Sequence, residues 1–300
     1  MSELRPLNAM TVDVEDYYQV SAFEGVVDRA RWDGYESRVE RNTRLVMDVL
    51  AAHDVRGTFF TLGWVADRHP NLLRELVARG HEVASHGYEH RLLTSLTKDA
   101  FRADLTRAAD AIERACGTRV RGFRAPSFSV GLDNLWVHDV LREEGYLFSS
   151  SVFPVRHDRY GIPDFPRHPV VLAGADGGTI WEFPMTTRRV LNRNFPIAGG
   201  GWMRLLPGAV MRRALRRENA TGAPTIVYLH PWELDPEQPR ITAAPRKARF
   251  RHYLNLGRMR DRLDRLLATF RYGTVSEVIA TLDPVAARTS WSPPVRTGLS

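Results

Sequence analysis

The chain has 300 residues, of which 43% are hydrophobic and 26% are charged, the ordinary composition of a globular protein that can bury a core and hold a rigid site. The net charge is +7, from 42 Lys and Arg against 35 Asp and Glu. Such an excess either reflects an Arg-rich composition or attracts nucleic acid, phosphorylated carriers, anionic glycans or a membrane surface, but no nucleic-acid-binding signature accompanies it and we expect no nucleic-acid partner.

Targeting and redox signals are weak. Residues 1–10 contain no apolar run of signal-peptide length, and no stretch of about 18 apolar residues predicts a transmembrane segment. The single cysteine, Cys116, cannot form an internal disulfide. We therefore expect a cytoplasmic protein, and peripheral contact with a membrane stays open.

Strand and helix patterns alternate along the first part of the chain. Residues 97–116 give a clear helix, because Thr97 suits its N-cap and Gly117 its C-terminal end. The other expected elements, in chain order, are strand 9–14, helix 40–52, strand 57–61, helix 72–78, strand 81–84, strand 120–123, helix 133–144, and strands 146–149, 180–183 and 225–229. This alternation predicts an α/β fold with parallel strands and right-handed crossovers.

The remaining segments are less regular. Residues 156–178 are rich in Pro, Gly, His and Asp, which indicates a long loop or a β-ribbon. Residues 247–270 have the periodicity of one long amphipathic helix. We expect residues 274–282 to close a barrel and residues 283–300 to form a loose tail. The catalytic unit is then a single domain over residues 1–282.

Three carboxylates, those of Asp13, Glu15 and Asp16, follow the first predicted strand. The C-terminal ends of parallel strands converge on one face of an α/β fold, where active sites form. Neighbouring carboxylates repel one another unless a cation lies among them. A divalent ion here, with one carboxylate left as a base, is the functional interpretation; an acidic turn is also common in purely structural settings.

Two histidines, His86 and His90, follow the predicted strand 81–84. At a separation of four residues they would project from one face of a helical turn, a spacing suited to one metal ion. Pairs at this separation also arise by chance, because the chain has ten histidines.

Two further strand ends carry polar residues. Arg124 follows strand 120–123 beside the rigid Pro126, and its guanidinium is suited to pair with a carboxylate and keep it ionised. His230 follows strand 225–229, where a lone histidine is more often structural. An acidic cluster, a histidine pair, an arginine and a distal histidine are together the groups that metal-assisted amide hydrolysis needs.

The order of these motifs resembles the polysaccharide deacetylase family, also called carbohydrate esterase family 4 or the NodB-homology family. The segment Ser85-His86-Gly87-Tyr88-Glu89-His90 is similar to the metal-binding motif of the family. Arg124-Ala125-Pro126 is similar to its Arg-x-Pro motif, and Leu229-His230 to its terminal Leu-x-His motif. The correspondence spans about residues 10–230.

A second resemblance covers the C-terminal part. Residues 230–240 and 250–254 resemble the extension found in deacetylases of bacterial exopolysaccharide loci, here about residues 231–282. The family resemblance implies a distorted (β/α) barrel of the NodB-homology type with about seven parallel strands. It also implies hydrolysis of N-acetyl groups from amino-sugar units of a polysaccharide or its precursor, with release of acetate.

The resemblance implies a role for each motif residue. Asp13 is the general base, His230 the general acid for the leaving amine, and Arg124 the group that orients the base. His86 and His90 are metal ligands. The implied cofactor is a divalent ion, Zn²⁺ first and Co²⁺ or another ion second, and the implied partner is an N-acetylated glycan.

The sequence departs from the family pattern at two places. The common first motif has adjacent Asp residues, whereas here Val14 follows Asp13, so the carboxylate ligand comes from Glu15 or Asp16. Glu15 is slightly favoured because alternate side chains of a strand face the same side; Asp16 serves if the chain turns first. At Ser149 relatives tend to carry an Asp that supports the catalytic groups, so its absence lowers activity unless another acid compensates.

The substrate-binding residues are less certain from the pattern. Tyr18, Pro126, Trp202 and Trp232 lie near the expected mouth of the site, but buried aromatic residues often only pack. Two other functions stay open: an allantoinase-like amidohydrolase acting on a small cyclic amide, and a glycan-binding module with a decayed site, for which Ser149 is the main motive. Retention of both metal-motif histidines and the extension argue against the first.

Overall fold

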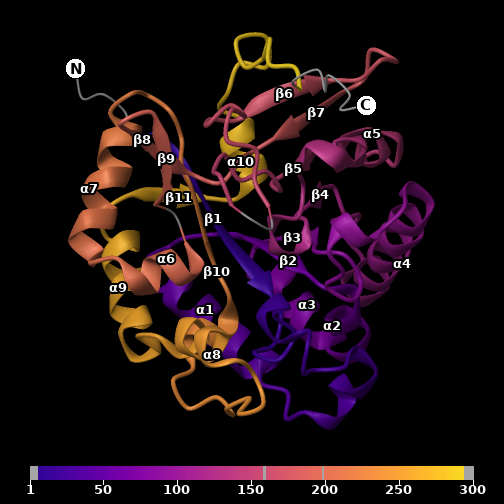
Figure 1. The fold of residues 1–300 in the computed structure, drawn as a ribbon, viewed down its shortest axis with the longest axis vertical. Coiled ribbons are helices and arrows are strands. Elements are labelled where there is room, and N and C mark those ends of the chain that lie inside the picture. The colour runs from indigo at the N-terminus through magenta and orange to yellow at the C-terminus, as the bar shows by residue number, and fades with distance from the viewer. Residues whose placement is uncertain (1–5, 158–159, 198, 294–300) are drawn as a thin grey trace, which may run out of the picture.

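One curled sheet of nine strands organises the computed structural model, which describes residues 6–157, 160–197 and 199–293 (Figure 1). The strand order is β10-β1-β2-β3-β4-β5-β7-β6, and β11 pairs with the start of β1. All neighbours are parallel except β6 and β7. The strands are β1 Leu7–Val14, β2 Thr58–Thr61, β3 Glu82–Ser85, β4 Gly122–Phe123, β5 Phe148–Ser149, β6 Val170–Ala173, β7 Thr179–Glu182, β10 Ile226–Leu229 and β11 Arg271–Gly273.

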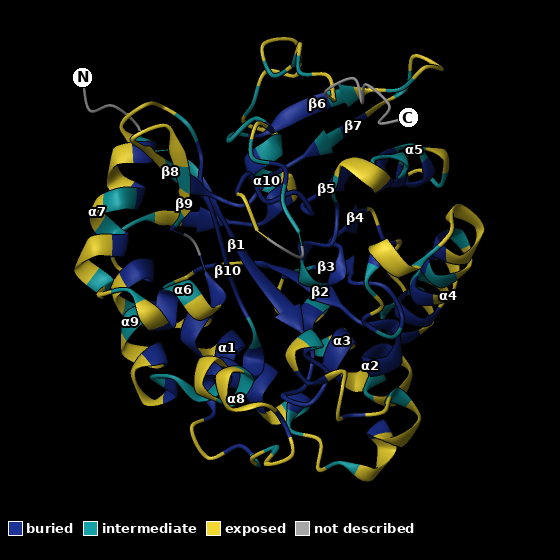
Figure 2. Ribbon diagram, in the orientation of Figure 1, coloured by how far each residue is buried: buried dark blue, intermediate teal, exposed yellow. Residues whose placement is uncertain are grey.

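The predicted distorted α/β barrel is confirmed, in the form of a half-barrel. The strand order runs from β10 at one edge to β6 at the other, and eight described strands pair in parallel where about seven were expected. The central strand β1 is buried at every residue after Leu7. This is the pattern of a parallel strand covered on both faces (Figure 2).

Helices flank the sheet on both sides, with α2 to α5 on the right in Figure 1 and α6, α7 and α9 on the left. The predicted ends of α4 are confirmed: Thr97 accepts a hydrogen bond from Ala100 N at 3.2 Å, and Gly117 has φ of 71°. The hairpin of β8 Thr187–Val190 and β9 Arg193–Pro196 lies outside the sheet. The helices are α1 Val39–Ala51, α2 Gly63–Arg68, α3 Pro70–Ala78, α4 Lys98–Cys116, α5 Trp136–Glu143, α6 Gly200–Leu205, α7 Gly208–Asn219, α8 Arg246–Tyr253, α9 Met259–Leu267 and α10 Val275–Ile279.

The single long helix expected over residues 247–270 is wrong. The segment breaks between α8 and α9, where Asn255 has φ of 53°. A left-handed residue cannot continue a right-handed helix. Asn255 Nδ2 also donates to the carbonyl oxygen of Arg204 at 2.9 Å, so a contact with a distant segment holds the break in place.

One of the C-terminal expectations needs a correction. Residues 274–282 do not supply a strand: β11 ends at Gly273, and α10 occupies this segment. In the described part of the tail 283–300, Ala287 O accepts from Val171 N at 3.0 Å and the ring of Trp291 lies 4.8 Å from that of Phe165, while the residues of this part are partly or fully exposed. The loose tail stays a prediction. Residues 294–300 lie outside the described residues.

Residues 156–178 contain both of the structures that the sequence left open. The described residues 156–157 and 160–169 form a loop, and β6 then pairs with β7 as an antiparallel ribbon; residues 158–159 lie outside the described ranges. None of the helices in the described part of the chain has the length and apolar character needed to cross a membrane.

Candidate active site

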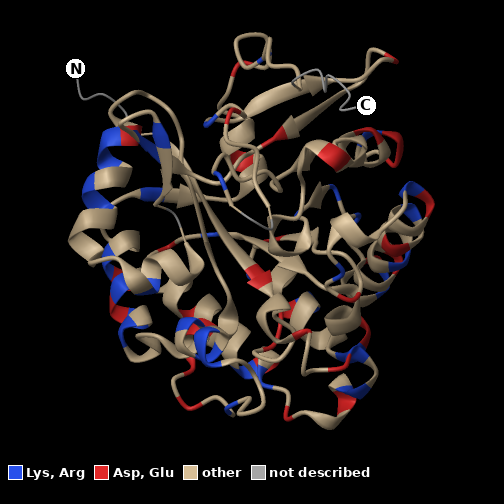
Figure 3. Cartoon of the chain, viewed as in Figure 1, with Lys and Arg blue, Asp and Glu red and all other residues tan. Residues whose placement is uncertain are grey.

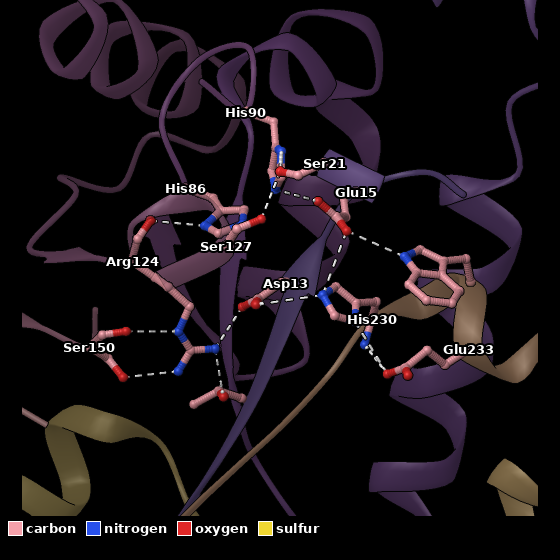
Figure 4. Close-up of polar contacts among 12 residues, drawn as sticks. Asp13, Glu15, Ser21, His86, His90, Arg124, Ser127, Ser150, His230 and Glu233 are labelled. Atoms are coloured by element: carbon pink, nitrogen blue, oxygen red, sulfur yellow. Dashed lines mark hydrogen bonds and ion pairs between the residues drawn. The ribbon is translucent and has the colours of Figure 1, made fainter. Parts of the chain in front are cut away.

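The register of the parallel sheet brings chemistry-bearing strand ends to one edge. Val12 of β1 pairs with Leu229 of β10, and Ser85 of β3 pairs with Phe123 of β4. The residues that follow these four positions are Asp13, His230, His86 and Arg124. Because strands β1 to β4 are in register, these predicted site residues converge (Figure 4).

Glu15, His86 and His90 form a group that is suited to hold a metal ion. Each residue offers one ligand atom, and these atoms lie within 4.8 Å of one another. All three are buried, and His90 Nε2 lies 3.0 Å from Glu15 Oε2. One carboxylate and two imidazoles are donors that Zn²⁺ prefers, so the residues present fit the implied ion.

The two imidazoles meet through a loop, and the predicted helical turn is wrong. Residues 86–90 lie outside any helix, and both Gly87 and His90 have left-handed backbone, with φ of 74° and 53°. These two positions turn the chain so that the imidazole ring centroids lie 5.3 Å apart. The histidines are therefore close, as expected, but for a different conformational reason.

His86 is held in the form of imidazole that binds metal. Its Nδ1 lies 2.9 Å from the carbonyl oxygen of Arg124, which can only accept, so Nδ1 carries the hydrogen and Nε2 keeps its lone pair. Burial, reinforced by the neighbouring His90, lowers the pKa of His86 to about 3. Burial alone would raise the pKa of Glu15, but the charge and hydrogen bond of His90 outweigh it and lower that pKa, so Glu15 is ionised.

Arg124 is fully buried and fixes Asp13. Its Nη1 donates to Asp13 Oδ1 at 2.6 Å and to Thr11 Oγ1 at 2.9 Å. Its Nε and Nη2 donate to the carbonyl and hydroxyl oxygens of Ser150 at 3.1 and 3.0 Å. The other carboxylate oxygen, Asp13 Oδ2, faces His230 Nε2 at 3.9 Å.

His230 is held from behind by Glu233, an acid that the sequence analysis did not single out. In the 3₁₀ turn Pro231–Leu234, Glu233 Oε2 accepts from the backbone N of His230 at 2.9 Å and lies 3.3 Å from its Nδ1. Arg204 of α6 donates its Nε to Glu233 Oε1 at 2.6 Å. The spacing of His230 and Glu233 is that of a capping box, which is the signal that could have found the pair.

This arrangement keeps His230 protonated. Burial lowers the pKa of His230, but the hydrogen bond to Glu233 and the charges of Glu15, Glu233 and Asp13 outweigh it and raise the pKa to about 9. Glu233 itself is ionised: burial raises its pKa, but Arg204 and His230 lower it to about 2. At neutral pH the site therefore presents an imidazolium toward Asp13 and Glu15.

Asp16, the alternative carboxylate ligand, does not join the group around the histidines. Its Oδ2 accepts hydrogen bonds at the start of α1 from Ser37 Oγ, Arg38 N and Val39 N, at 2.8, 2.8 and 3.1 Å. Burial raises the pKa of Asp16 to about 6, against the lowering effect of these bonds. The geometry places Glu15 beside the histidines and gives Asp16 the role of a helix cap.

Two predicted substrate-binding residues are too buried to present a face to a sugar. Trp232 is 4% exposed and lies between the rings of His230 and His252, at 5.1 and 4.0 Å between centroids. Its Nε1 lies 3.4 Å from Glu15 Oε1, so it supports the Glu15 carboxylate. Tyr18 is 1% exposed and is stacked within the core.

The other two predicted substrate-binding residues differ in exposure. Pro126 is buried in the short turn that follows Arg124. Trp202 lies on α6 and is half-buried. Its contact with substrate stays a prediction.

Ser149, the position at which relatives tend to carry an Asp, lies next to a loop that is held by a buried glutamate. Ser149 Oγ donates to Ser151 Oγ at 2.9 Å. Buried Glu182 of β7 accepts from the backbone N of Ser151 and of Val152, both at 2.8 Å, and lies 2.9 Å from His138 Nε2. Glu182 therefore anchors this loop, whereas the acid beside Nδ1 of His230 is Glu233.

The loop after β1 adds a contact that the sequence did not predict. Ser21 Oγ lies 3.5 Å from His90 Nδ1 and 2.7 Å from Ser127 Oγ. Arg29 donates to the carbonyl oxygens of Glu89 and His90 at 2.9 and 3.2 Å. This loop thus holds the His90 side of the metal group.

Two family models match the chain. Residues 33–146 match the model described as Polysaccharide deacetylase, and residues 150–280 match a domain of unknown function, DUF3473. The site takes residues from both matched regions and from the segment before them. His86, His90 and Arg124 lie in the first region, His230 and Glu233 in the second, and Asp13 and Glu15 precede both.

Curated relatives match part of the chain. A chitooligosaccharide deacetylase of Sinorhizobium fredii is 40% identical over 97 residues, which are 32% of this chain and 42% of the relative. A peptidoglycan-N-acetylglucosamine deacetylase of Bacillus cereus is 30% identical over 84 residues, 28% of this chain and 30% of the relative. The chain therefore spans less than half the length of these relatives.

The fold has solved counterparts. The crystal structure of a candidate polysaccharide deacetylase from Mycobacterium smegmatis has a TM-score of 0.61 to this chain, with 98% of each chain covered and 21% identity. At this identity the likeness supports the fold.

Proposed function

We propose that the chain is a polysaccharide deacetylase, which hydrolyses N-acetyl groups from amino-sugar units of a polysaccharide or its precursor and releases acetate. The observation that carries the proposal is the position of His230 across from two carboxylates: its Nε2 lies 3.6 Å from Glu15 Oε1 and 3.9 Å from Asp13 Oδ2. The relatives named for chitooligosaccharide and peptidoglycan support an amino-sugar substrate. The resemblance of the C-terminal part to exopolysaccharide-locus deacetylases favours an exopolysaccharide or its precursor.

The metal group supports a metal-dependent reaction. Glu15, His86 and His90 would hold the ion, for which Zn²⁺ is the first choice and Co²⁺ the second. When bound, the ion supplies Lewis acidity toward the acetamide carbonyl oxygen and toward water. The hydrogen bond from His86 Nδ1 to Arg124 O fixes the orientation of one ligand.

The protein groups then divide the proton transfers. Asp13, oriented by Arg124 through Oδ1, accepts the proton of the attacking water as its oxygen bonds to the carbonyl carbon. His230 donates its proton to the amine nitrogen as the carbon–nitrogen bond breaks. Glu233 and Arg204 keep His230 charged and fix its ring without touching substrate.

The catalytic unit in this proposal is residues 1–282. Two residues support this extent: the base Asp13 lies on β1, and the acid His230 directly follows the neighbouring strand β10, although the two are 217 residues apart in the sequence. Neither matched region contains both groups.

The test is acetate release from chitooligosaccharides and soluble peptidoglycan fragments by the Zn²⁺- or Co²⁺-loaded protein, with Asp13→Asn as the inactive control. Acetate release by the wild type that is lost in the control supports deacetylation. Hydrolysis of allantoin without acetate release would instead favour the amidohydrolase. Glycan binding without acetate release at any metal or pH would favour a binding module with a decayed site.

A further inference from the structure

The positive charge of the chain is concentrated in one part of it. Residues 188–272 carry 18 Lys and Arg against 6 Asp and Glu, whereas the rest of the chain carries 24 against 29. Figure 3 shows this excess over α7, α8 and α9. Three of the six acids are buried in ion pairs away from α8: Glu218 with Arg188, Glu233 with Arg204, and Asp235 with Arg38.

A cleft of about 500 Å³ lies within this basic region. It is lined by Arg240, Arg246 and Arg249 together with polar and aromatic side chains. The contacts of these arginines in the described part of the chain are with neutral groups: Arg240 lies 4.6 Å over the ring of Tyr253, and Arg249 donates to Thr242 O at 3.3 Å. No described acid lies within ion-pair distance of the three guanidinium groups.

A second cleft provides the contrast. It lies on the His90 side of the centre, where Glu24, Asp28 and Glu89 line it together with two arginines. Arg29 pairs with Glu24, and Arg91 pairs with Glu89 at 3.1 Å. Its positive charge is thus compensated, whereas that of the first cleft is not.

The basic cleft is linked to the catalytic site through the end of α8. Tyr253 lines the cleft, and the preceding residue, His252, stacks on Trp232 at 4.0 Å. Trp232 in turn stacks on His230. Arg204, which holds Glu233, also donates to His252 O at 2.6 Å, so the end of α8 is attached to the residues that position the catalytic acid.

We propose that this cleft binds an oxyanion group of the substrate, a phosphate in the first instance, and that the preferred substrate is a phosphate-bearing N-acetylated glycan. The identification of the bound molecule as substrate rests on the proposed deacetylation. Guanidinium groups form paired hydrogen bonds with phosphate and carboxylate oxygens, and three uncompensated cations match a multiply charged phosphate better than a single carboxylate. Phe250, 66% exposed at the rim of the cleft, offers an aromatic face beside the anion.

The binding test uses inorganic pyrophosphate as probe, titrated calorimetrically into the full chain. The double variant Arg246→Ala/Arg249→Ala removes two cleft charges, and Arg216→Ala/Arg217→Ala removes two exposed charges from α7 as the matched control. We expect the dissociation constant to rise about tenfold or more in the cleft variant and to stay within about twofold in the control. Equal weakening in both variants would overturn the proposal, because it would indicate a diffuse charge effect.

The substrate test compares kcat/KM for a chitooligosaccharide with and without a phosphate at its reducing end. We expect the phosphorylated form to be preferred by the wild type and the preference to vanish in the cleft variant, with the rate on the neutral form unchanged. Equal or greater preference for a uronate-containing oligosaccharide would overturn phosphate as the recognised group. Because pyrophosphate binding does not require turnover, its retention in a protein that releases no acetate would locate the failure in the proposed function.

Vesicles test the competing source of the anion. We expect no more binding to phosphatidylglycerol vesicles than to phosphatidylcholine vesicles. Strong binding to phosphatidylglycerol vesicles that is lost equally in both double variants, with no discrimination among soluble phosphates, would contradict the proposal. It would show that the basic surface as a whole binds membranes.

Discussion

Two histidines of the site have opposite protonation states: His86, in the group suited to a metal ion, is neutral, and His230, across from Asp13, is protonated. Burial lowers the pKa of His86 to about 3, whereas the partners of His230 overcome burial and raise its pKa to about 9. The difference lies in what each Nδ1 contacts. His86 faces the carbonyl oxygen of Arg124, and His230 faces the carboxylate of Glu233.

This contrast indicates that the partner of Nδ1 decides whether each histidine is suited to bind a metal ion or to donate a proton. A carbonyl partner orients a neutral imidazole and leaves its other nitrogen ready to bind a metal ion. A carboxylate partner stabilises an imidazolium, which is ready to donate a proton. Groups whose surroundings push their pKa values apart are the natural acid and ligand of a hydrolytic site.

The largest effect is expected from Asp13→Asn, which removes the carboxylate that lies between Arg124 and His230. Without a base for water, kcat should fall about 10³-fold, within the range typical of a lost general base. Steady-state acetate release measures the loss, and metal content should stay unchanged. A fall of less than tenfold with intact metal would remove Asp13 as the base.

The next effect is expected from Glu233→Gln, which removes the charge behind His230 while keeping the size of the side chain. Because His230 loses the partner that keeps it charged, we expect kcat to fall about 10²-fold, at the lower end of the range for general acid–base catalysis. Activity of the variant is measured as kcat and kcat/KM, and circular dichroism of the same sample reports whether the variant is folded.

The chain offers a matched control for this variant in Glu218→Gln. Glu218 is also buried between arginines: burial raises its pKa, but His168 and Arg188 lower it to about 2. It does not contact His230, so activity should change by less than about threefold. Equal losses in the two variants would mean that Glu233 acts only through folding.

The pH profile sharpens the comparison further. The pKa of His230 is raised to about 9, so the protonated acid persists below that pH and is lost as pH rises through it. We expect kcat/KM of the wild type to decline above about pH 9. In Glu233→Gln this decline of kcat/KM should begin at lower pH. If it begins at the same pH as in the wild type, a group other than His230 causes it.

The smallest effect on activity is expected from Asp16→Ala. Its three hydrogen bonds cap α1, so the free energy of unfolding should fall by about 1 kcal/mol. In denaturant titrations this shifts the midpoint, while kcat/KM stays within about threefold. An activity loss as large as that of Glu15→Ala would restore Asp16 as a candidate ligand.

Much of the site could be predicted because its residues follow strands in short motifs. Four of them come directly after a paired strand position: Asp13, His86, Arg124 and His230. Because the strands are parallel and in register, these four positions lie at the same edge of the sheet. The choice between Glu15 and Asp16 depended on how the chain turns after β1, which the spacing alone left open.

The missed features depend on contacts between distant segments. Arg204 lies on α6, 29 residues before Glu233, and no local pattern links the two. The break between α8 and α9 depends on the contact of Asn255 with Arg204. Trp232 is buried because His252, from the same broken segment, covers it.

The most direct test of the account is the metal content of purified protein after dialysis against Zn²⁺, in the wild type and in the neighbouring variants Glu15→Ala and Asp16→Ala. We predict one ion per chain in the wild type and in Asp16→Ala, and its loss in Glu15→Ala. A full complement of metal in Glu15→Ala, or its loss in Asp16→Ala, would contradict the assignment of Glu15, His86 and His90 as the group that holds the ion.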